Sequence, residues 1–366
     1  MKIILSRPEL VHLIGTIQSI VSSKPPIPIL ANVSIEAKGN ELTLRATDLT
    51  VSIQGQMEAS ILQEGAITLP ARHFFQLIRE LTTPEIQIEV VNDAIARIES
   101  AHSKFEIKGM HHSEFPSFPD LTQEKSFTIE AASFKEMLSK SMFAAAKEDP
   151  RHVLNGVLMQ IEKKTAIFTG TDGKRLSRVT TAIESDSTAS HRSLIPLKAV
   201  EEISRLLDGK TPVKITLMSD KIGFECGPTR LITQLLSGEY PDVERIIPKE
   251  TVFRVSLHRE ELMTLLKQVA LFTSDKNHSV HFTFTSGELI LKAQSSDFGQ
   301  GTVSMPVDYN GDPFEIAFNP FFFNDILRHC KDETVSFAMT TPYNPGLITD
   351  FTAAQFVLMP MRLATM

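Results

Sequence analysis

The chain has 366 residues, enough for two or three domains of ordinary size, and its 42% apolar and 22% charged residues are typical of a globular protein. The net charge of −7 argues against a protein that grips nucleic acid over a wholly basic surface. No apolar run approaches the ~18 residues of a membrane span, so we expect no membrane partner. Cys226 and Cys330 are the only cysteines and form no C-x-x-C pair, so we expect no disulfide framework and a cytoplasmic location.

The first predicted element is a short strand that runs into an amphipathic helix. Ile3 and Leu5 alternate as in a strand, and after four residues Leu10, Leu13 and Ile14 follow at helical spacing. The same spacing returns twice, at Phe127, Ile129, Phe134, Met137 and Leu138 and at Val255, Leu257, Leu262, Leu265 and Leu266.

A second helical pattern follows each of these elements. "LPARHFFQLIREL" places apolar residues at Leu69, Phe74, Leu77 and Leu81. The identical spacing recurs at Ile195, Val200, Ile203 and Leu207 and at Phe318, Phe323, Ile326 and Cys330. A residue suited to a helix start stands at each strand-to-helix step, namely Pro70, Pro196 and Asn319.

Alternating segments typical of strands, such as "ELTLRAT" and "VKITLM", fill the remaining sequence. The chain is therefore predicted to be an α+β protein of three tandem units, with domains at 1–124, 125–250 and 251–366. The repetition either serves stability alone or builds a shape such as an arc or a ring.

The six predicted helices carry more positive charge than the rest of the chain. They hold eleven Lys and Arg against eight Asp and Glu, a net of +3, which leaves −10 for the remainder. If the helices share one face, that face would hold a polyanion loosely; otherwise the excess reflects solvated helix surfaces. The predicted helices cover residues 7–22, 71–81, 133–147, 197–207, 259–272 and 320–330.

The segment "GTDGKRLS" (170–177) contains a Gly-Lys step but fails the phosphate-loop pattern, because only two residues separate its glycines and Arg175 follows Lys174. Asp172-Gly173 instead predicts a turn between two strands, and Thr47-Asp48-Leu49 stands at the matching place of the first repeat. We find no catalytic constellation, cofactor motif or metal-ligand spacing, and we expect no enzyme. The terminal "FVLMPMRL" is either an ordinary last strand or a Met-lined adaptable groove.

Several stretches together resemble the bacterial sliding clamp family, the beta subunits of DNA polymerase III. They are "PIPIL" (26–30), "LNGVL" (154–158), "TDGKRL" (171–176), "EYPDVERIIP" (239–248) and "MPMRL" (359–363). The resemblance implies a head-to-tail homodimer that forms a ring around duplex DNA without reading its sequence, with helices inside and antiparallel sheets outside. It also implies a groove that binds the clamp loader, the replicative polymerase alpha subunit and other proteins with a clamp-binding motif. By position the groove would comprise Leu154, Thr171, Gly173, Lys174, Arg175, Leu176, Pro241, Arg245, Ile246, Val357, Leu358, Met359, Pro360, Met361 and Arg362.

The resemblance further implies that phosphate contacts fall to Lys24, Arg72, Arg151 and Lys198. The dimer would join Phe105 and Ile107, on a predicted edge strand, to Leu271 and Phe272. The tail Ala364–Met366 continues past the matched motif and would lie near the groove. Two other classes remain open: an enzyme that uses the Asp172-Lys174-Arg175 loop, and an interaction scaffold with the same repeats but no ring.

Overall fold

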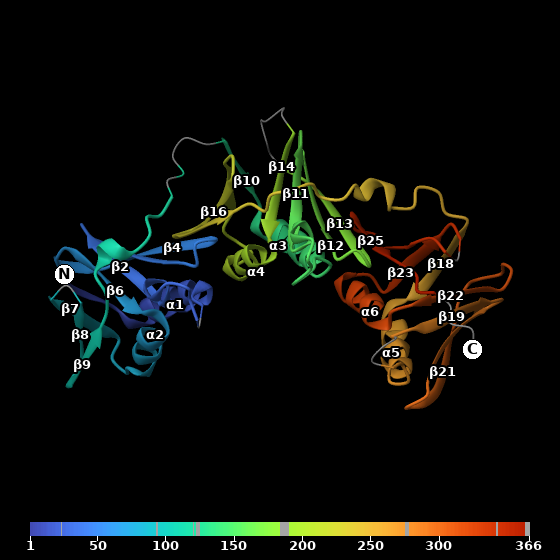
Figure 1. Ribbon diagram of the computed structural model, residues 1–366, viewed down its shortest axis with the longest axis horizontal. Coiled ribbons are helices and arrows are strands. Elements are labelled where there is room, and N and C mark those ends of the chain that lie inside the picture. The colour runs from blue at the N-terminus through green and yellow to red at the C-terminus, as the bar shows by residue number, and fades with distance from the viewer. Residues whose placement is uncertain are drawn as a thin grey trace. The chain divides into compact units, whose positions relative to one another are not determined.

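The computed structural model describes residues 1–22, 24–92, 94–119, 121, 125–183, 190–274, 278–341 and 343–362. The chain folds into two compact units, each built from two segments of sequence. Unit 1 comprises Met1–Lys135 and Lys198–Leu235, and unit 2 comprises Glu136–Leu197 and Leu236–Met366. Each unit is made of antiparallel sheets and helices (Figure 1).

Unit 1 holds a five-stranded sheet in the order β5-β1-β7-β8-β9 and an eight-stranded sheet in the order β10-β15-β16-β17-β4-β3-β2-β6. The pairing of β17 with β4 runs from Thr229 opposite Gly55 to Thr233 opposite Val51, and it joins strands of the first and second repeats. The elements are β1 (Lys2–Ser6), α1 (Arg7–Ile17), β2 (Asn32–Lys38), β3 (Glu41–Thr47), β4 (Val51–Glu58), β5 (Ser60–Gln63), β6 (Gly65–Pro70), α2 (Ala71–Glu80), β7 (Glu85–Asn92), β8 (Ile95–Ser100), β9 (Ser103–Lys108), β10 (Lys125–Ile129), α4 (Leu197–Leu206), β15 (Val213–Leu217), β16 (Lys221–Cys226) and β17 (Thr229–Gln234).

Unit 2 holds an eight-stranded sheet in the order β14-β11-β12-β13-β25-β24-β23-β18 and a four-stranded sheet in the order β21-β20-β19-β22. Here β13 pairs with β25, from Arg175 opposite Leu358 to Val179 opposite Ala354, and joins the second repeat to the third. The elements are β11 (Gly156–Glu162), β12 (Thr165–Thr171), β13 (Arg175–Ala182), β14 (His191–Pro196), β18 (Phe253–His258), α5 (Arg259–Ala270), β19 (Val280–Thr285), β20 (Glu288–Ser295), β21 (Gly299–Pro306), β22 (Phe314–Phe318), α6 (Pro320–His329), β23 (Thr334–Met339), β24 (Gly346–Thr349) and β25 (Ala354–Leu358). The helix α3 (Ala131–Met142) begins in unit 1 and continues into unit 2 after Lys135.

These pairings explain why three sequence repeats give two compact units. Strands of the second repeat complete one sheet with β4 and another with β25, so its residues are shared between the units. The domain limits at 124 and 250 therefore stay a prediction.

The predicted helical stripes form the core. Leu10, Leu13 and Ile14 of α1 are buried, and Phe323 and Ile326 of α6 are fully buried against the Phe-rich interior of unit 2. All six helices are confirmed, with some ends displaced. Among the described residues, no helix is long and apolar enough to cross a bilayer.

All six helices end one or more residues before the predicted position, and α1 and α3 do so by five residues. The segment 7–22 is α1 to Ile17 and then a 3₁₀ turn over Gln18–Ile20. The segment 133–147 is α3, which runs from Ala131 to Met142, and β12 packs closely against its last turn: a Cβ on Gly170 would lie 2.2 Å from the Ser141 carbonyl oxygen. Only a glycine permits this approach of strand to helix.

Candidate functional site

The turn Thr171–Arg175 is fixed by its own side chains. The Asp172 carboxylate accepts hydrogen bonds from the backbone N–H of Lys174 and of Arg175, each at 2.9 Å. The Thr171 hydroxyl donates to the Arg175 carbonyl at 2.6 Å and accepts from the Gly173 N–H at 3.1 Å. Gly173 has φ +82°, a conformation that glycine adopts without strain. The predicted turn between two strands is therefore confirmed, and four hydrogen bonds from its own side chains hold it.

Arg175 connects this turn to α6. Its guanidinium donates to Asp172 Oδ2 at 3.1 Å and to Asp325 Oδ2 at 2.7 Å. The Arg175 side chain is only 12% exposed and Asp172 is 17% exposed, so their ion pair is largely shielded from water, while Asp325 is 34% exposed. The Arg175 side chain thus bonds the turn through Asp172 and reaches α6 through Asp325.

Apolar residues from distant segments gather next to the turn. Leu154, Leu176 and Val357, three predicted groove residues, are at most 2% exposed and belong to one hydrophobic cluster. The cluster also contains Tyr240 and Leu347. Its remaining members are Ala146, Leu158, Leu194, Val243 and Ile247, with Val153 and Leu236 packed against it.

The terminal Met residues run across this region with a fixed backbone. The Met359 N–H donates to the Lys174 carbonyl at 2.9 Å, and the Met361 N–H donates to the Ala317 carbonyl at 2.7 Å. Met359 is 40% exposed, although it follows the buried Leu358 directly. Ile246, which precedes the cluster residue Ile247 in sequence, is 37% exposed. We call the buried cluster the floor of the candidate groove and the two exposed apolar residues, Met359 and Ile246, its rim.

The other predicted groove residues divide by exposure. Thr171 is buried within the turn, while Pro360 and Met361 are half-buried. Those exposed are Gly173, Lys174, Pro241, Arg245 and Arg362. The tail Ala364–Met366 lies outside the described residues.

The sequence analysis did not single out several residues of this region. Tyr240 is 8% exposed, its hydroxyl donates to the Thr169 carbonyl at 3.3 Å, and burial raises its pKa. The quoted segment "EYPDVERIIP" contains Tyr240 and Val243, so their apolar character was a usable signal. Leu347, Phe322 and Asp325 had none, because nothing in the local sequence brings α6 and β24 to residue 175.

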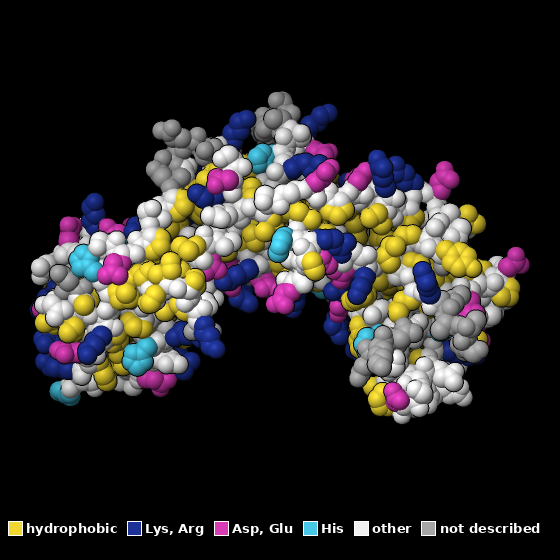
Figure 2. All heavy atoms as spheres, viewed as in Figure 1, with side chains coloured by type: hydrophobic (Ala, Val, Ile, Leu, Met, Phe, Trp, Pro, Cys, Tyr) yellow, Lys and Arg dark blue, Asp and Glu magenta, His cyan; other side chains and the backbone are white. Residues whose placement is uncertain are grey.

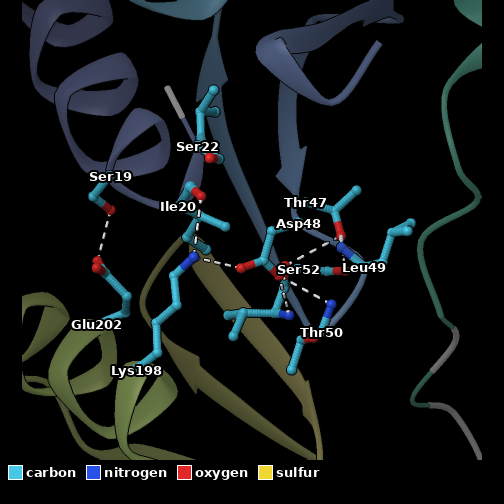
Figure 3. A network of polar contacts seen from close by, with 12 residues as sticks. Ser19, Ile20, Ser22, Thr47, Asp48, Leu49, Thr50, Ser52, Lys198 and Glu202 are labelled. Carbon is cyan, nitrogen blue, oxygen red and sulfur yellow. Dashed lines mark hydrogen bonds and ion pairs between the residues drawn. The ribbon is translucent and has the colours of Figure 1, made fainter. Parts of the chain in front are cut away.

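Lys198, a predicted phosphate contact, is engaged within unit 1. Its ammonium forms an ion pair with Asp48 and donates to the Ile20 carbonyl at 3.4 Å (Figure 3). Beside it the Ser19 hydroxyl donates to Glu202 Oε2 at 2.6 Å. These contacts join α4 to the segment that follows α1 and to the β3–β4 turn.

The other predicted phosphate contacts differ in how free they are. Arg72 donates to the Val21 carbonyl at 3.3 Å, and Arg151 pairs with Asp149 at 3.0 Å. The hydrogen bonds from Arg151 hold the pKa of Asp149 at about 2. The exposed Lys24 side chain has no polar partner among the described residues, so it is the freest of the four.

Basic side chains of the first helix in each repeat cap the second helix. Arg7 donates to the Ile78 and Arg79 carbonyls at 3.0 and 2.5 Å, at the end of α2. Lys135 donates to the Leu207 carbonyl at 2.8 Å, and Arg259 to the Asp332 carbonyl at 2.9 Å. Such contacts satisfy carbonyls at or just beyond a helix C-terminus, where positive charge is favoured.

Further helix cations are paired with carboxylates, so the +3 excess is largely used in the fold. Lys140 is 3% exposed and pairs with Glu136 and Asp350. Arg79, Arg205 and Arg328 also form ion pairs. Of the eleven, Lys147 and Lys267 have no polar side-chain partner in the described part of the chain. Figure 2 accordingly shows basic and acidic side chains interspersed on the visible face.

The predicted dimer residues lie on two separate surfaces. β9 is an edge strand, as predicted, and Phe105 is 36% exposed, but Ile107 is only 5% exposed. The expectation of two exposed apolar side chains on β9 is therefore wrong for Ile107, and Phe105 is the exposed one. A pocket of about 540 Å³ lies at this edge, lined by His73, Gln76, Leu77, Glu80 and residues 104–107.

The other two predicted dimer residues follow α5. Leu271 is 73% exposed, and the Phe272 ring lies over Gly301 of the edge strand β21.

No group of three or more His, Cys, Asp or Glu among the described residues could hold a metal ion. Both cysteines are free, and burial raises the pKa of Cys330 to about 12.

Three family models match the chain in order. They describe the N-terminal, central and C-terminal domains of the DNA polymerase III beta subunit and match residues 1–119, 128–242 and 244–362. The chain is 46% identical to the beta sliding clamp of Chlamydia muridarum, across 99% of both chains, and 30% identical to that of Proteus mirabilis, across 99% of this chain and all of that one.

Solved structures agree with these matches. The DNA polymerase III subunit beta of Pseudomonas aeruginosa superimposes with a TM-score of 0.95 at 26% identity, over 99% of this chain and all of that one. The sliding clamp of Bacillus subtilis, at 23% identity over the full length of both chains, has the same fold with a TM-score of 0.95. With three tandem clamp domains and this fold, the chain belongs to the DNA polymerase III beta subunit family, the beta sliding clamps.

Proposed function

We propose that two copies of this chain close into a ring around duplex DNA and tether the replicative polymerase to it. The observation that carries the proposal is the convergence of Leu154, Leu176 and Val357 into one buried apolar cluster. Met359 and Ile246, which adjoin buried residues in sequence, add exposed apolar side chains. Full-length similarity to beta sliding clamps supports the same reading. The role is one of binding and not catalysis, and it belongs in the cytoplasm.

The groove would take a short apolar segment of its partners. The clamp loader, the polymerase alpha subunit and other proteins with a clamp-binding motif would insert Leu and Phe side chains over the cluster. Such anchors fill desolvated pockets and dominate binding energy. The rigid turn behind Leu176 favours this use, because a preorganised wall loses little entropy on binding.

DNA would be held by enclosure more than by charge. Most helix cations are engaged in caps and ion pairs, so few phosphate contacts remain for Lys24, Lys147 and Lys267 and for weakly paired residues such as Arg72. Affinity for open DNA should then be weak and should fall with salt, whereas enclosure persists in salt.

The ring would close through two edge strands. β9 carries Phe105 beside its pocket, and β21 lies beside Phe272 and the exposed Leu271. Unpaired edges with exposed apolar side chains invite pairing, and a two-fold repeat of one contact gives a closed dimer. The limits 1–124, 125–250 and 251–366 are our proposed domains for each copy.

Light scattering at micromolar concentration and retention on DNA test the ring together. We expect a dimer mass, retention on closed circles at high salt, and release once the circles are linearised. Leu271→Ala combined with Phe272→Ala should give monomers that are not retained. A wild-type monomer would instead support the scaffold without a ring, and a turnover that Lys174→Ala abolishes would support an enzyme.

A further inference from the structure

Asp325 lies on α6, and its carboxylate faces the turn from the far side of Arg175. Asp325 Oδ2 accepts from Arg175 Nη1 at 2.7 Å, and its other oxygen accepts from Arg328 Nη1 at 3.1 Å. Arg175 and Asp325 are 150 residues apart in sequence. The first contact is shielded, since Arg175 is 12% exposed, whereas Arg328 is 56% exposed.

Two aromatic rings enclose the same guanidinium. Its carbon lies 4.7 Å from the centre of the Phe322 ring and 5.4 Å from that of the Phe143 ring. Phe143 in turn stacks on His329 at 4.0 Å with the rings nearly parallel. Planar guanidinium groups favour such sites, since they stack on rings while donating in their own plane. Arg175 is therefore fixed in position by α6 and by the residue that follows α3.

The backbone around Arg175 carries the rim of the apolar cluster. The Lys174 carbonyl, next to Arg175, accepts the Met359 N–H at 2.9 Å. Arg175 and Leu176 stand opposite Leu358 and Val357 in the β13–β25 pairing. A displacement of Arg175 would pass directly to Leu176 in the floor and to Met359 at the rim.

We propose that Asp325 is a positioning residue for the peptide groove: it fixes Arg175, and through Arg175 it sets the turn and the Met359 backbone. This inference rests on the proposed function, because it concerns the shape of the same groove. Asp325 itself is not a member of the floor cluster, and its side chain is 34% exposed.

The test compares Asp325→Asn with Arg328→Gln. Asn keeps the size of Asp325 but removes the charge that Arg175 pairs with, whereas Arg328→Gln removes the exposed pair on the same carboxylate. We expect Asp325→Asn to weaken binding of a Gln-Leu-Asp-Leu-Phe peptide about tenfold, which corresponds to ~1.4 kcal/mol. Arg328→Gln should stay within about twofold of wild type, as exposed pairs contribute little.

Hydrogen exchange of the Met359 amide in the free protein gives a second reading. Asp325→Asn should speed this exchange, and Asp325→Glu, which restores the charge, should reverse part of the change. Arg175→Lys probes the contact from the other side, because an ammonium lacks the planar fork; it keeps the inference testable if Asp325→Asn does not fold.

The outcomes separate the two proposals. The positioning role would be overturned if Asp325→Asn changed neither peptide affinity nor Met359 amide exchange. It would also be overturned if Arg328→Gln lowered peptide affinity as much as Asp325→Asn does. In both cases the proposed groove would stand. A wild-type protein that binds no peptide would overturn the proposed groove, and faster Met359 exchange in Asp325→Asn would still establish the positioning contact.

Discussion

Two turns of the molecule have the same internal bonding and different uses. In unit 1, Asp48 Oδ1 accepts from the N–H groups of Thr50 and Val51 at 2.9 and 2.7 Å, and the Thr47 hydroxyl donates to the Val51 carbonyl at 3.1 Å. In unit 2, Asp172 Oδ1 and the Thr171 hydroxyl make the equivalent bonds to Lys174 and Arg175. The repeats therefore preserve the turn itself.

The difference lies in what the second oxygen of each aspartate binds. Asp48 Oδ2 pairs with Lys198 of α4, so the first turn joins neighbouring elements of unit 1 (Figure 3). Asp172 Oδ2 pairs with Arg175, which continues to Asp325. The fifth residue of the turn accounts for this difference: Val51 is buried and apolar, whereas Arg175 forms an ion pair with Asp325 of α6. One scaffold thus serves as a structural joint in one copy and as a wall of the proposed groove in the other.

The strongest way to break this comparison is to remove the residue that follows the turn in unit 2. Leu176 is 2% exposed, so Leu176→Ala should lower the free energy of unfolding by about 2–5 kcal/mol. The matching Ser52→Ala should change it by roughly 1 kcal/mol, the net contribution of one hydroxyl hydrogen bond. Chemical denaturation of both variants measures the contrast. Equal losses of unfolding free energy would mean that the residue after each turn contributes equally to stability.

A smaller effect is expected where the groove contacts only its partner. Met361 is half-buried and its backbone is held by Ala317, so Met361→Ala should leave the protein folded. It should weaken the Gln-Leu-Asp-Leu-Phe peptide about tenfold or more, since a buried anchor contributes roughly 1.5–3 kcal/mol. Titration by calorimetry checks this, with Lys198→Ala as the control in the other unit. Deletion of Ala364–Met366 belongs in the series, because tighter binding would show competition by the tail. Wild-type affinity in a folded Met361→Ala dimer would mean that the groove has been misplaced.

Lys198 and Asp48 test the joint of unit 1. The pair is partly exposed, so Lys198→Ala and Asp48→Asn should show a coupling of about 0.2–1 kcal/mol in a double-mutant cycle of unfolding free energies. Retention of the loaded ring on closed DNA circles should not change. If the two losses of unfolding free energy were additive and Lys198→Ala also reduced retention on DNA circles, Lys198 would instead be a phosphate contact, as the resemblance implied.

The sequence predicted the elements better than their contacts. Period and spacing identified all six helices, because an apolar stripe such as Leu10, Leu13 and Ile14 records which face is buried. They could not show that Lys198 meets Asp48 or that Arg175 meets Asp325, since both contacts span 150 residues. Nor could alternation on β9 reveal that Ile107 is covered while Phe105 is exposed. Burial at a sheet edge depends on the helix that packs there.

The third residue of each turn offers the most selective test, because the two positions share one backbone conformation. Leu49 has φ 76° and Gly173 has φ +82°, so both adopt the left-handed conformation, but only Leu49 has a Cβ that opposes it. That conformation costs a non-glycine residue roughly 1–2 kcal/mol, while glycine adds about 0.5–1 kcal/mol of chain entropy in the unfolded state. Because Leu49 is 47% exposed, Leu49→Gly also loses the burial of about half a side chain, which offsets this gain, so the free energy of unfolding should change by less than about 0.5 kcal/mol. Gly173→Ala should lower the free energy of unfolding by about 1 kcal/mol, since it introduces the strained conformation and brings a Cβ within 3.1 Å of the Arg151 guanidinium. Urea denaturation of the two variants measures both changes. A Gly173→Ala variant that is more stable than wild type would show that residue 173 does not need the left-handed conformation that it shares with Leu49.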